Sequence, residues 1–323
     1  MKRAFKTFLF LFLSIGLGLF NQALALTVDP FYAGTYTAVD LGSVPGVPAN
    51  YGGLTLKSGD SNTLLIGGAA NTASGQLYSI GVTRDGSSHI NGFSSKASVF
   101  ADAAYNDGGV VYGPGDVLFL ARWPVNGLGE TKPGSTITDK IVDLGLLGVT
   151  PSPGGLAFVP SGFPGAGKLK LVSWSGGQWY TLNIAPDGLG TFDVTSATHE
   201  VTIGGGPEGI FYVPTGSPLF GTPSVLVSEY SAGAVGAYEI NSNGDPILGT
   251  RRDFITGLSG AEGAAIDPIT GDFLFSTFGG GNRLIVVKGF VPPPPPGGQV
   301  PEPATGVLLA SGMAGILAWR RRK

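Results

Sequence analysis

Residues 204–213 read Gly-Gly-Gly-Pro-Glu-Gly-Ile-Phe-Tyr-Val, a glycine-rich stretch that runs directly into a β-strand pattern. Its Glu208-Gly209 pair, followed by an apolar residue, is one copy of a mark that recurs along the chain. The other copies are Gly-Gly-Leu at 52–54, Gly-Gly-Val at 108–110, Gly-Gly-Leu at 154–156 and Glu-Gly-Ala at 262–264. A spacing near 50 residues is typical of a propeller or another repeat array.

Each mark opens a unit with the pattern of a four-stranded sheet. A second, apolar strand follows the mark, and these segments are 62–66, 117–123, 168–174, 224–230 and 272–278. A third strand usually carries a tyrosine and runs into a tight turn, which is Asp85-Gly86, Asp187-Gly188 or Asn243-Gly244. These dipeptides tolerate the positive φ angles of hairpin turns. A fourth strand then leads to the next mark.

The repeat predicts an all-β fold, a β-propeller with five blades. The last unit lacks a fourth strand before Pro292, whereas Phe31 to Leu41 has the pattern of a strand. We therefore expect this N-terminal strand to complete the last unit and to close the ring, which hides strand edges. The irregular stretch 92–150 leaves room for a sixth blade. An open β-solenoid or a pair of sandwiches is the alternative to a closed ring.

The composition agrees with an all-β protein and excludes some chemistry. The 323 residues include 55 glycines and 24 prolines, and 42% of the residues are hydrophobic. Such a chain disfavours helices but can bury a sizeable core. It contains no cysteine, which excludes thiol nucleophiles, iron–sulfur ligation and cysteine zinc sites.

The first 25 residues have the pattern of a secretory signal peptide. Lys2, Arg3 and Lys6 precede the apolar run Phe8 to Phe20, and Ala23 and Ala25 form a small-x-small cleavage site. We expect the Sec machinery to export the chain and signal peptidase to cut after Ala25. A retained membrane anchor is the alternative.

Residues 292–323 have the pattern of a linker and a membrane anchor behind an exported body at 26–291. Residues 292–299 are rich in proline and glycine, and the five prolines favour a stiff rod of about 16 Å. The uncharged run Ala304 to Trp319 would extend about 24 Å as a helix, a minimal membrane span. Four cations follow it, which places Lys323 in the cytoplasm and the body outside. A plain tail anchor is the simplest interpretation.

Three parts of this tail occur in a specific order. Pro301-Glu302-Pro303 comes first, the apolar run second, and Arg320, Arg321 and Arg322 third. This arrangement resembles the PEP-CTERM sorting signal of Gram-negative bacteria. The resemblance implies an exosortase as partner, a membrane-embedded, transpeptidase-like cysteine enzyme that cuts near Pro-Glu-Pro. The expected route is export, an inner-membrane intermediate and then the cell surface or the extracellular space.

The charge of the exported body argues against nucleic acid as a partner. Of 19 cations, three lie in the signal peptide and four in the terminal cluster, which leaves 12. Of 22 acids, Glu302 lies beyond residue 299, which leaves 21 and a net charge of about −9. Nucleic-acid binding needs clustered lysine and arginine.

The body carries few signs of catalysis. No Gly-x-Ser-x-Gly elbow is present, and His89 and His199 do not form a zinc-binding pair. The match of residues 204–209 to Gly-x-Gly-x-x-Gly precedes a strand pattern, whereas a dinucleotide site requires a helix. We therefore expect a binding or structural propeller at the cell surface rather than an enzyme.

Glu208 and Glu262 are the candidate metal ligands, because they hold equivalent places in consecutive units. Equivalent inner-strand positions converge near a propeller axis, where two carboxylates repel unless a cation lies between them. Ca²⁺ accepts such oxygen ligands. Pro207-Glu208-Gly209 and the repeat resemble gluconolactonase-type metal-dependent propellers, although the first three marks have glycine in place of glutamate. The resemblance implies a lactonase-like hydrolase as the alternative function. The alternative for both glutamates is an exposed or hydrogen-bonded place at a turn.

Overall fold

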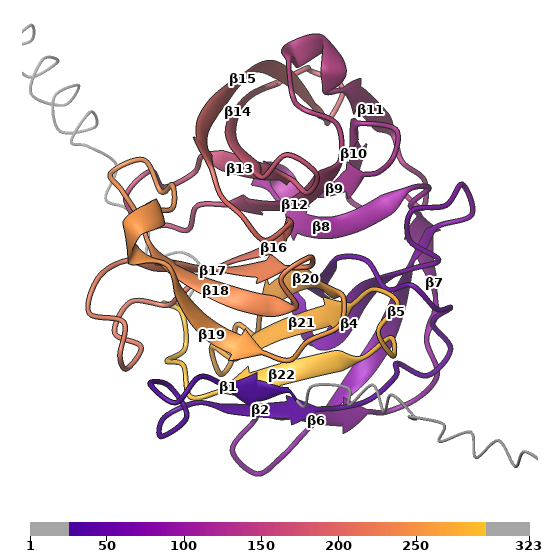
Figure 1. Ribbon diagram of the computed structural model, residues 1–323. Helices are drawn as coiled ribbons and strands as arrows, with labels where there is room; N and C mark the ends of the chain where they lie inside the picture. The colour runs from indigo at the N-terminus through magenta and orange to yellow at the C-terminus, as the bar shows by residue number, and fades with distance from the viewer. Residues whose placement is uncertain (1–25, 295–323) are drawn as a thin grey trace, which may run out of the picture.

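The computed structural model describes residues 26–294, which form five antiparallel sheets around a central axis (Figure 1). The five-bladed all-β propeller is confirmed. Within these residues the helical segments are three 3₁₀ turns, at Pro114–Asp116, Gly145–Leu147 and Leu248–Thr250. No helix of this part of the chain is long and apolar enough to cross a membrane. The predicted signal peptide, the run Ala304 to Trp319 and the sorting residues lie outside the described residues.

The strands follow the chain from the axis outward within each blade. Blade I contains β3 (Leu54–Lys57), β4 (Asp60–Gly68), β5 (Gln76–Arg84) and β6 (Ile90–Phe93), and β7 (Ser98–Asp102) also pairs with β5. Blade II contains β8 (Asn106–Tyr112), β9 (Leu118–Arg122), β10 (Gly127–Thr131) and β11 (Lys140–Asp143). Blade III contains β12 (Pro153–Phe158), β13 (Leu169–Ser173), β14 (Gln178–Pro186) and β15 (Phe192–Thr202). The stretch 92–150 therefore belongs to blades I and II and holds no sixth blade.

The last two blades take their outermost strands from the N-terminal segment. Blade IV contains β16 (Pro207–Tyr212), β17 (Ser224–Glu229), β18 (Ala234–Glu239), β19 (Arg252–Thr256) and β1 (Thr27–Val28). Blade V contains β20 (Ala261–Ile266), β21 (Phe273–Thr277), β22 (Leu284–Lys288) and β2 (Thr37–Asp40). The expected closure by β2 is confirmed, whereas the pairing of β1 with blade IV was not foreseen. Figure 1 shows both indigo strands beside β19 and β22.

The second glycine of each mark lets neighbouring inner strands touch. The inner strands β3, β8, β12, β16 and β20 contact one another in that order around the ring. A Cβ atom on Gly53 would lie 2.7 Å from the backbone nitrogen of Val110, and one on Gly263 would lie 2.6 Å from the Cα atom of Gly53. A Cβ atom on Gly155 would overlap the carbonyl oxygen of Glu208. The repeated mark is thus the packing contact that forms the ring.

Aspartates of the predicted hairpin turns also connect adjacent blades. Asp85 accepts hydrogen bonds from backbone N–H groups of its own turn, and its other oxygen lies 2.9 Å from Nζ of Lys288 in blade V. Asp187 does the same in blade III, where its second oxygen lies 2.8 Å from Nζ of Lys140 in blade II. These turn residues therefore stabilise both the local hairpin and the interface between blades.

Candidate metal centre in the central channel

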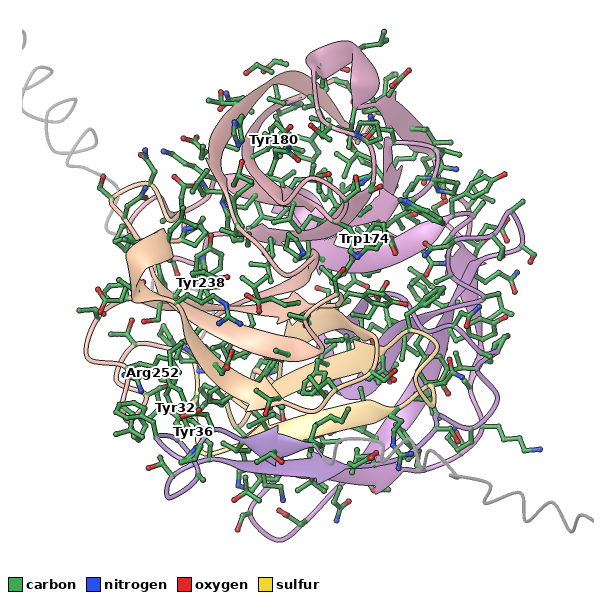
Figure 2. All side chains as sticks on the ribbon, in the orientation of Figure 1. Tyr32, Tyr36, Trp174, Tyr180, Tyr238 and Arg252 are labelled. Carbon is green, nitrogen blue, oxygen red and sulfur yellow. The ribbon has the colours of Figure 1, made fainter. Side chains whose placement is uncertain are left out.

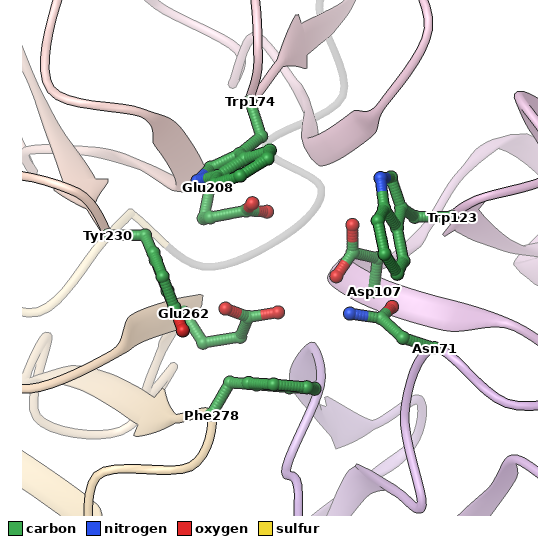
Figure 3. Close-up of a pocket in the computed structure, with 8 residues that line it drawn as sticks. All are labelled: Asn71, Asp107, Trp123, Trp174, Glu208, Tyr230, Glu262 and Phe278. Atoms are coloured by element: carbon green, nitrogen blue, oxygen red, sulfur yellow. The ribbon is translucent and has the colours of Figure 1, made fainter.

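Three acidic residues lie at the same level of three inner strands. Asp107, Glu208 and Glu262 are each the second residue of their strand, in β8, β16 and β20. Each strand has a bulge at this point, because its register with the neighbouring strand shifts across the acidic residue. A bulge re-aims a side chain relative to a regular strand. Figure 3 shows the three carboxylates converging from three blades.

The three carboxylates form one compact cluster. Each contributes an oxygen, and these oxygens all lie within 4.8 Å of one another. Asp107, Glu208 and Glu262 are 3%, 4% and 2% exposed. Glu208 Oε2 and Glu262 Oε1 are buried and have no hydrogen-bond partner. Unpartnered buried carboxylate oxygens are costly, so this arrangement is suited to hold a cation.

Glycines in the second and third marks provide the space for this cluster, and a glycine in the first mark provides space for Asn106. A Cβ atom on Gly108 would lie 2.7 Å from Glu208 Oε2, and one on Gly154 would overlap the same oxygen. A Cβ atom on Gly52 would overlap the side chain of Asn106. This explains why the second and third marks have glycine in place of glutamate. The Glu208 side chain fits into the channel only because the glycines beside it have no side chain.

An aromatic collar surrounds the carboxylates, and we use this name for Trp123, Trp174, Tyr230 and Phe278. Each of these half-buried residues directly follows the second strand of its blade. Adjacent rings meet edge to face, with centroids 6.1 Å apart for Trp174 and Tyr230 and 6.3 Å apart for Tyr230 and Phe278. In blade I, Asn71, which lies in the loop after the second strand β4, lines the cavity in place of an aromatic residue (Figure 3). Together these side chains line a cavity of about 130 Å³ above the carboxylates.

Burial and mutual repulsion keep protons on these carboxyl groups. Burial raises the pKa of Asp107 to about 7, although hydrogen bonds with Glu262 and Asn71 oppose the shift. Burial raises the pKa of Glu208 well above its ordinary value, and the charge of Asp107 adds to the effect. The pKa of Glu262 is raised by burial and then by the charges of Glu208 and Asp107. Within residues 26–294, no lysine, arginine or histidine lines the cavity to offset them.

These shifts predict that the metal-free protein loses stability as the pH rises. In the unfolded chain the carboxyl groups release their protons near about pH 4, whereas the folded protein retains them up to about 7 for Asp107. The contribution of these three groups to stability is therefore full below about pH 4. It falls as the pH rises from there to the folded-state pKa values, by about 1.4 kcal/mol per pH unit for one group. Urea unfolding in chelator between pH 5 and 8 measures this slope.

A triple variant isolates the contribution of the cluster. Asp107→Asn, Glu208→Gln and Glu262→Gln together should flatten the slope, because their amides do not titrate. Glu130, buried between blades II and III and with a pKa of about 7, stays in this variant and keeps its own contribution in the same direction. A slope equal to that of the unchanged protein would refute the assignment.

The structure brings the two predicted glutamates together and adds residues that sequence reasoning missed. Glu208 and Glu262 are buried on inner strands, not exposed at turns. Asp107 was missed, although it directly precedes the mark at 108–110. The collar was missed too, although each predicted second strand in units two to five ends in an aromatic residue. His89 and His199 do not line the cavity; His89 Nδ1 lies 2.6 Å from Asp272 instead.

Several solved propellers resemble the body at low identity. A gluconolactonase from Xanthomonas campestris is 12% identical, with a TM-score of 0.46 and coverage of 83% of this chain and 84% of that one. A glutaminyl cyclase from Myxococcus xanthus is 13% identical, with a TM-score of 0.46 and coverage of 78% and 96%. The calcium-binding protein regucalcin from Agrobacterium tumefaciens is 14% identical, with a TM-score of 0.44 and coverage of 80% and 97%.

The C-terminal residues match a known family model. Among curated proteins, none matches this chain. Residues 299–323 match the PEP-CTERM protein-sorting motif, which confirms the resemblance noted from Pro301-Glu302-Pro303 and the basic residues. The motif implies export, a membrane-anchored passage and processing by an exosortase. The chain thus carries a PEP-CTERM sorting motif behind a five-bladed β-propeller.

Proposed function

We propose that the body is a cell-surface binding propeller whose channel holds a divalent cation, with Ca²⁺ as the best fit. The observation that carries this proposal is the cluster of three buried carboxylates with two unpartnered oxygens. Asp107, Glu208 and Glu262 supply three negative charges, which a divalent cation offsets in large part. The sorting motif supports the surface location, because it fits an exported protein.

The donor set fits calcium better than other common metals. Ca²⁺ takes six to eight oxygen ligands in flexible geometry, whereas Zn²⁺ prefers nitrogen and sulfur. Asn71 lines the same cavity, with its amide nitrogen toward the carboxylates, and its side-chain oxygen is buried and lacks a partner (Figure 3). A turn of this amide would offer the oxygen as a neutral fourth ligand. The remaining positions face the collar, where water or a bound ligand can reach them. The residues present therefore match a calcium site that is open on one side.

Calcium titration of chelator-treated protein tests the proposal. Calcium at about 100 times its dissociation constant should stabilise the fold by about 2.7 kcal/mol, read as a rise in the melting temperature. The rise should be larger at pH 7.5 than at pH 5.5, because the cation must displace protons from raised-pKa carboxyl groups. Glu208→Gln and Glu262→Gln should each abolish most of it.

A matched variant separates the site from general charge effects. Glu239→Gln removes an exposed glutamate of β18 and should leave the calcium response unchanged. Equal responses in Glu208→Gln and Glu239→Gln would contradict a channel site. A protein that responds to neither Ca²⁺, Mg²⁺ nor Mn²⁺ would contradict a divalent-cation site altogether.

A metal-dependent, lactonase-like hydrolase is the second candidate function. It is favoured by the open cavity above the carboxylates, which would let a small ester approach a bound cation. Hydrolysis of a panel of lactones with Ca²⁺, Mn²⁺ or Zn²⁺, lost in Glu208→Gln, would establish this activity. Calcium binding without turnover would leave the binding propeller as the function.

A further inference from the structure

The cavity opens on one face of the propeller. The chain leaves the propeller on the opposite face, toward residues 292–303, which we call the tether. Glu208 and Glu262 are near the starts of their inner strands, and the collar residue Phe278 follows the end of β21. β22 is antiparallel to β21 and so runs away from the cavity. It leads to Val291, the residue before the proline-rich linker. We call the face with the collar the mouth face and the face with Val291 the tether face.

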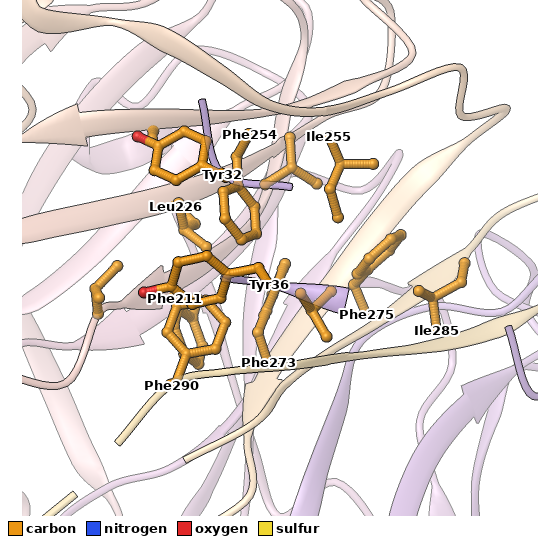
Figure 4. Close-up of a cluster of buried hydrophobic side chains, with 14 residues drawn as sticks. Tyr32, Tyr36, Phe211, Leu226, Phe254, Ile255, Phe273, Phe275, Ile285 and Phe290 are labelled. Carbon is orange, nitrogen blue, oxygen red and sulfur yellow. The ribbon is translucent and has the colours of Figure 1, made fainter. Parts of the chain in front are cut away.

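The root of the tether is held firmly on the tether face. Phe290 packs among aromatic side chains, with ring centroids 4.6 Å from Tyr36 and 5.3 Å from Phe211 (Figure 4). The backbone N–H of Val291 donates a hydrogen bond of 3.3 Å to Oγ of Ser217. The residues directly before the linker are therefore fixed to the body by packing and by a hydrogen bond.

The surface beside this root exposes two large apolar side chains next to arginine. Residues 213–223 contain no charged side chain. Leu219 is 46% exposed and Phe31 is 47% exposed. Both line one groove, whose charged residues are Arg251, Arg252 and Glu239. The guanidinium of Arg252 lies 4.2 Å from the centre of the Phe31 ring. Figure 2 shows Arg252 close to Tyr32 and Tyr36, which belong to the aromatic cluster around the root.

We propose that the tether face rests on the membrane surface during the anchored passage, so that the channel mouth points away from the membrane. Residues 292–303 separate Val291 from the apolar run Ala304 to Trp319, and twelve residues span at most about 43 Å. The body is thus confined near the lipid, with its tether face closest. Exposed Phe and Leu beside Arg suit the boundary between headgroups and acyl chains. The proposal does not depend on whether the channel holds a metal.

The lack of cysteine makes a direct test possible, because single cysteines can be labelled cleanly. Thr215→Cys places a fluorophore in the exposed loop of the tether face. Ala232→Cys places it in the turn after β17 on the mouth face, beyond a strand about 20 Å long. Each full-length variant is reconstituted in phosphatidylcholine–phosphatidylglycerol vesicles containing headgroup nitroxide lipids. We expect several-fold stronger quenching at position 215 than at 232.

Further variants test whether Phe31 and Leu219 contact the membrane surface. Phe31→Ser with Leu219→Ser should reduce quenching at position 215 while the chain still floats with the vesicles. Leu146→Ser is the matched control, since Leu146 is 85% exposed in the loop that leads into β12 at the mouth face. Equal quenching at 215 and 232, stronger quenching at 232, or a chain that does not float would overturn the proposal. Fluorophore self-quenching at 215 without lipid quenching would instead indicate a contact between two copies, which also overturns it.

Discussion

Replacing Gly155 with alanine is expected to destabilise the native fold severely. The added Cβ atom would overlap the carbonyl oxygen of Glu208, and both positions belong to the backbones of inner strands. A clash with backbone cannot be relieved by rotating a side chain, so blades III and IV would have to separate. We expect a loss above about 4 kcal/mol, which is a large part of the 5–15 kcal/mol that stabilises a typical protein.

Soluble yield and thermal melting followed by circular dichroism measure this effect. Gly221→Ala is the control, because no atom lies within 4 Å of the added Cβ and the site is exposed. It should change stability by less than about 1 kcal/mol. If Gly155→Ala melted within a few degrees of the unchanged protein, the proposed role of the marks in ring packing would be wrong.

The repeat was predictable because one physical requirement acts at every blade. Inner strands meet near the axis, so Gly53, Gly109, Gly155, Gly209 and Gly263 must all lack a side chain. That requirement leaves a glycine at the second position of all five marks. The missing strand of blade V was predictable for a similar reason, since an unpaired β22 needs a partner and Phe31 to Leu41 had the pattern of a strand.

The candidate site was only partly predictable, because its three acidic residues do not occupy the same position relative to the mark. Glu208 and Glu262 directly precede the second glycine of their marks, whereas Asp107 precedes Gly109 by two residues. In β8 three residues, 107–109, lie opposite one residue of β9, whereas in β16 two residues, 208 and 209, lie opposite one of β17. This longer bulge brings Asp107 to the level of the glutamates. No spacing rule in the sequence shows it.

Replacing Tyr36 with alanine is expected to destabilise the protein by about 3–5 kcal/mol, the usual loss for a large buried ring. Tyr36 is 1% exposed, and its ring packs against Phe254 and Phe290. It lies in the segment between β1 and β2, which pair with blades IV and V. Its loss should therefore loosen the outer strands of both blades at once.

Urea unfolding of Tyr36→Ala and Tyr36→Phe separates packing from hydrogen bonding. Tyr36→Phe keeps the ring and removes the hydroxyl, which donates a 2.5 Å hydrogen bond to the carbonyl oxygen of Pro218, and should cost about 1 kcal/mol. Equal losses in the two variants would show that the ring itself is not what holds the closure.

The same residue links the closure to the candidate site and to the tether. Glu208 and Glu262 stand on the inner strands of the two blades that β1 and β2 complete. Phe290, the root of the tether, packs on the Tyr36 ring. We therefore expect Tyr36→Ala to weaken the calcium response as well as the fold, whereas Tyr36→Phe should retain it. A full calcium response in Tyr36→Ala would mean that the inner strands hold the carboxylates independently of the outer closure.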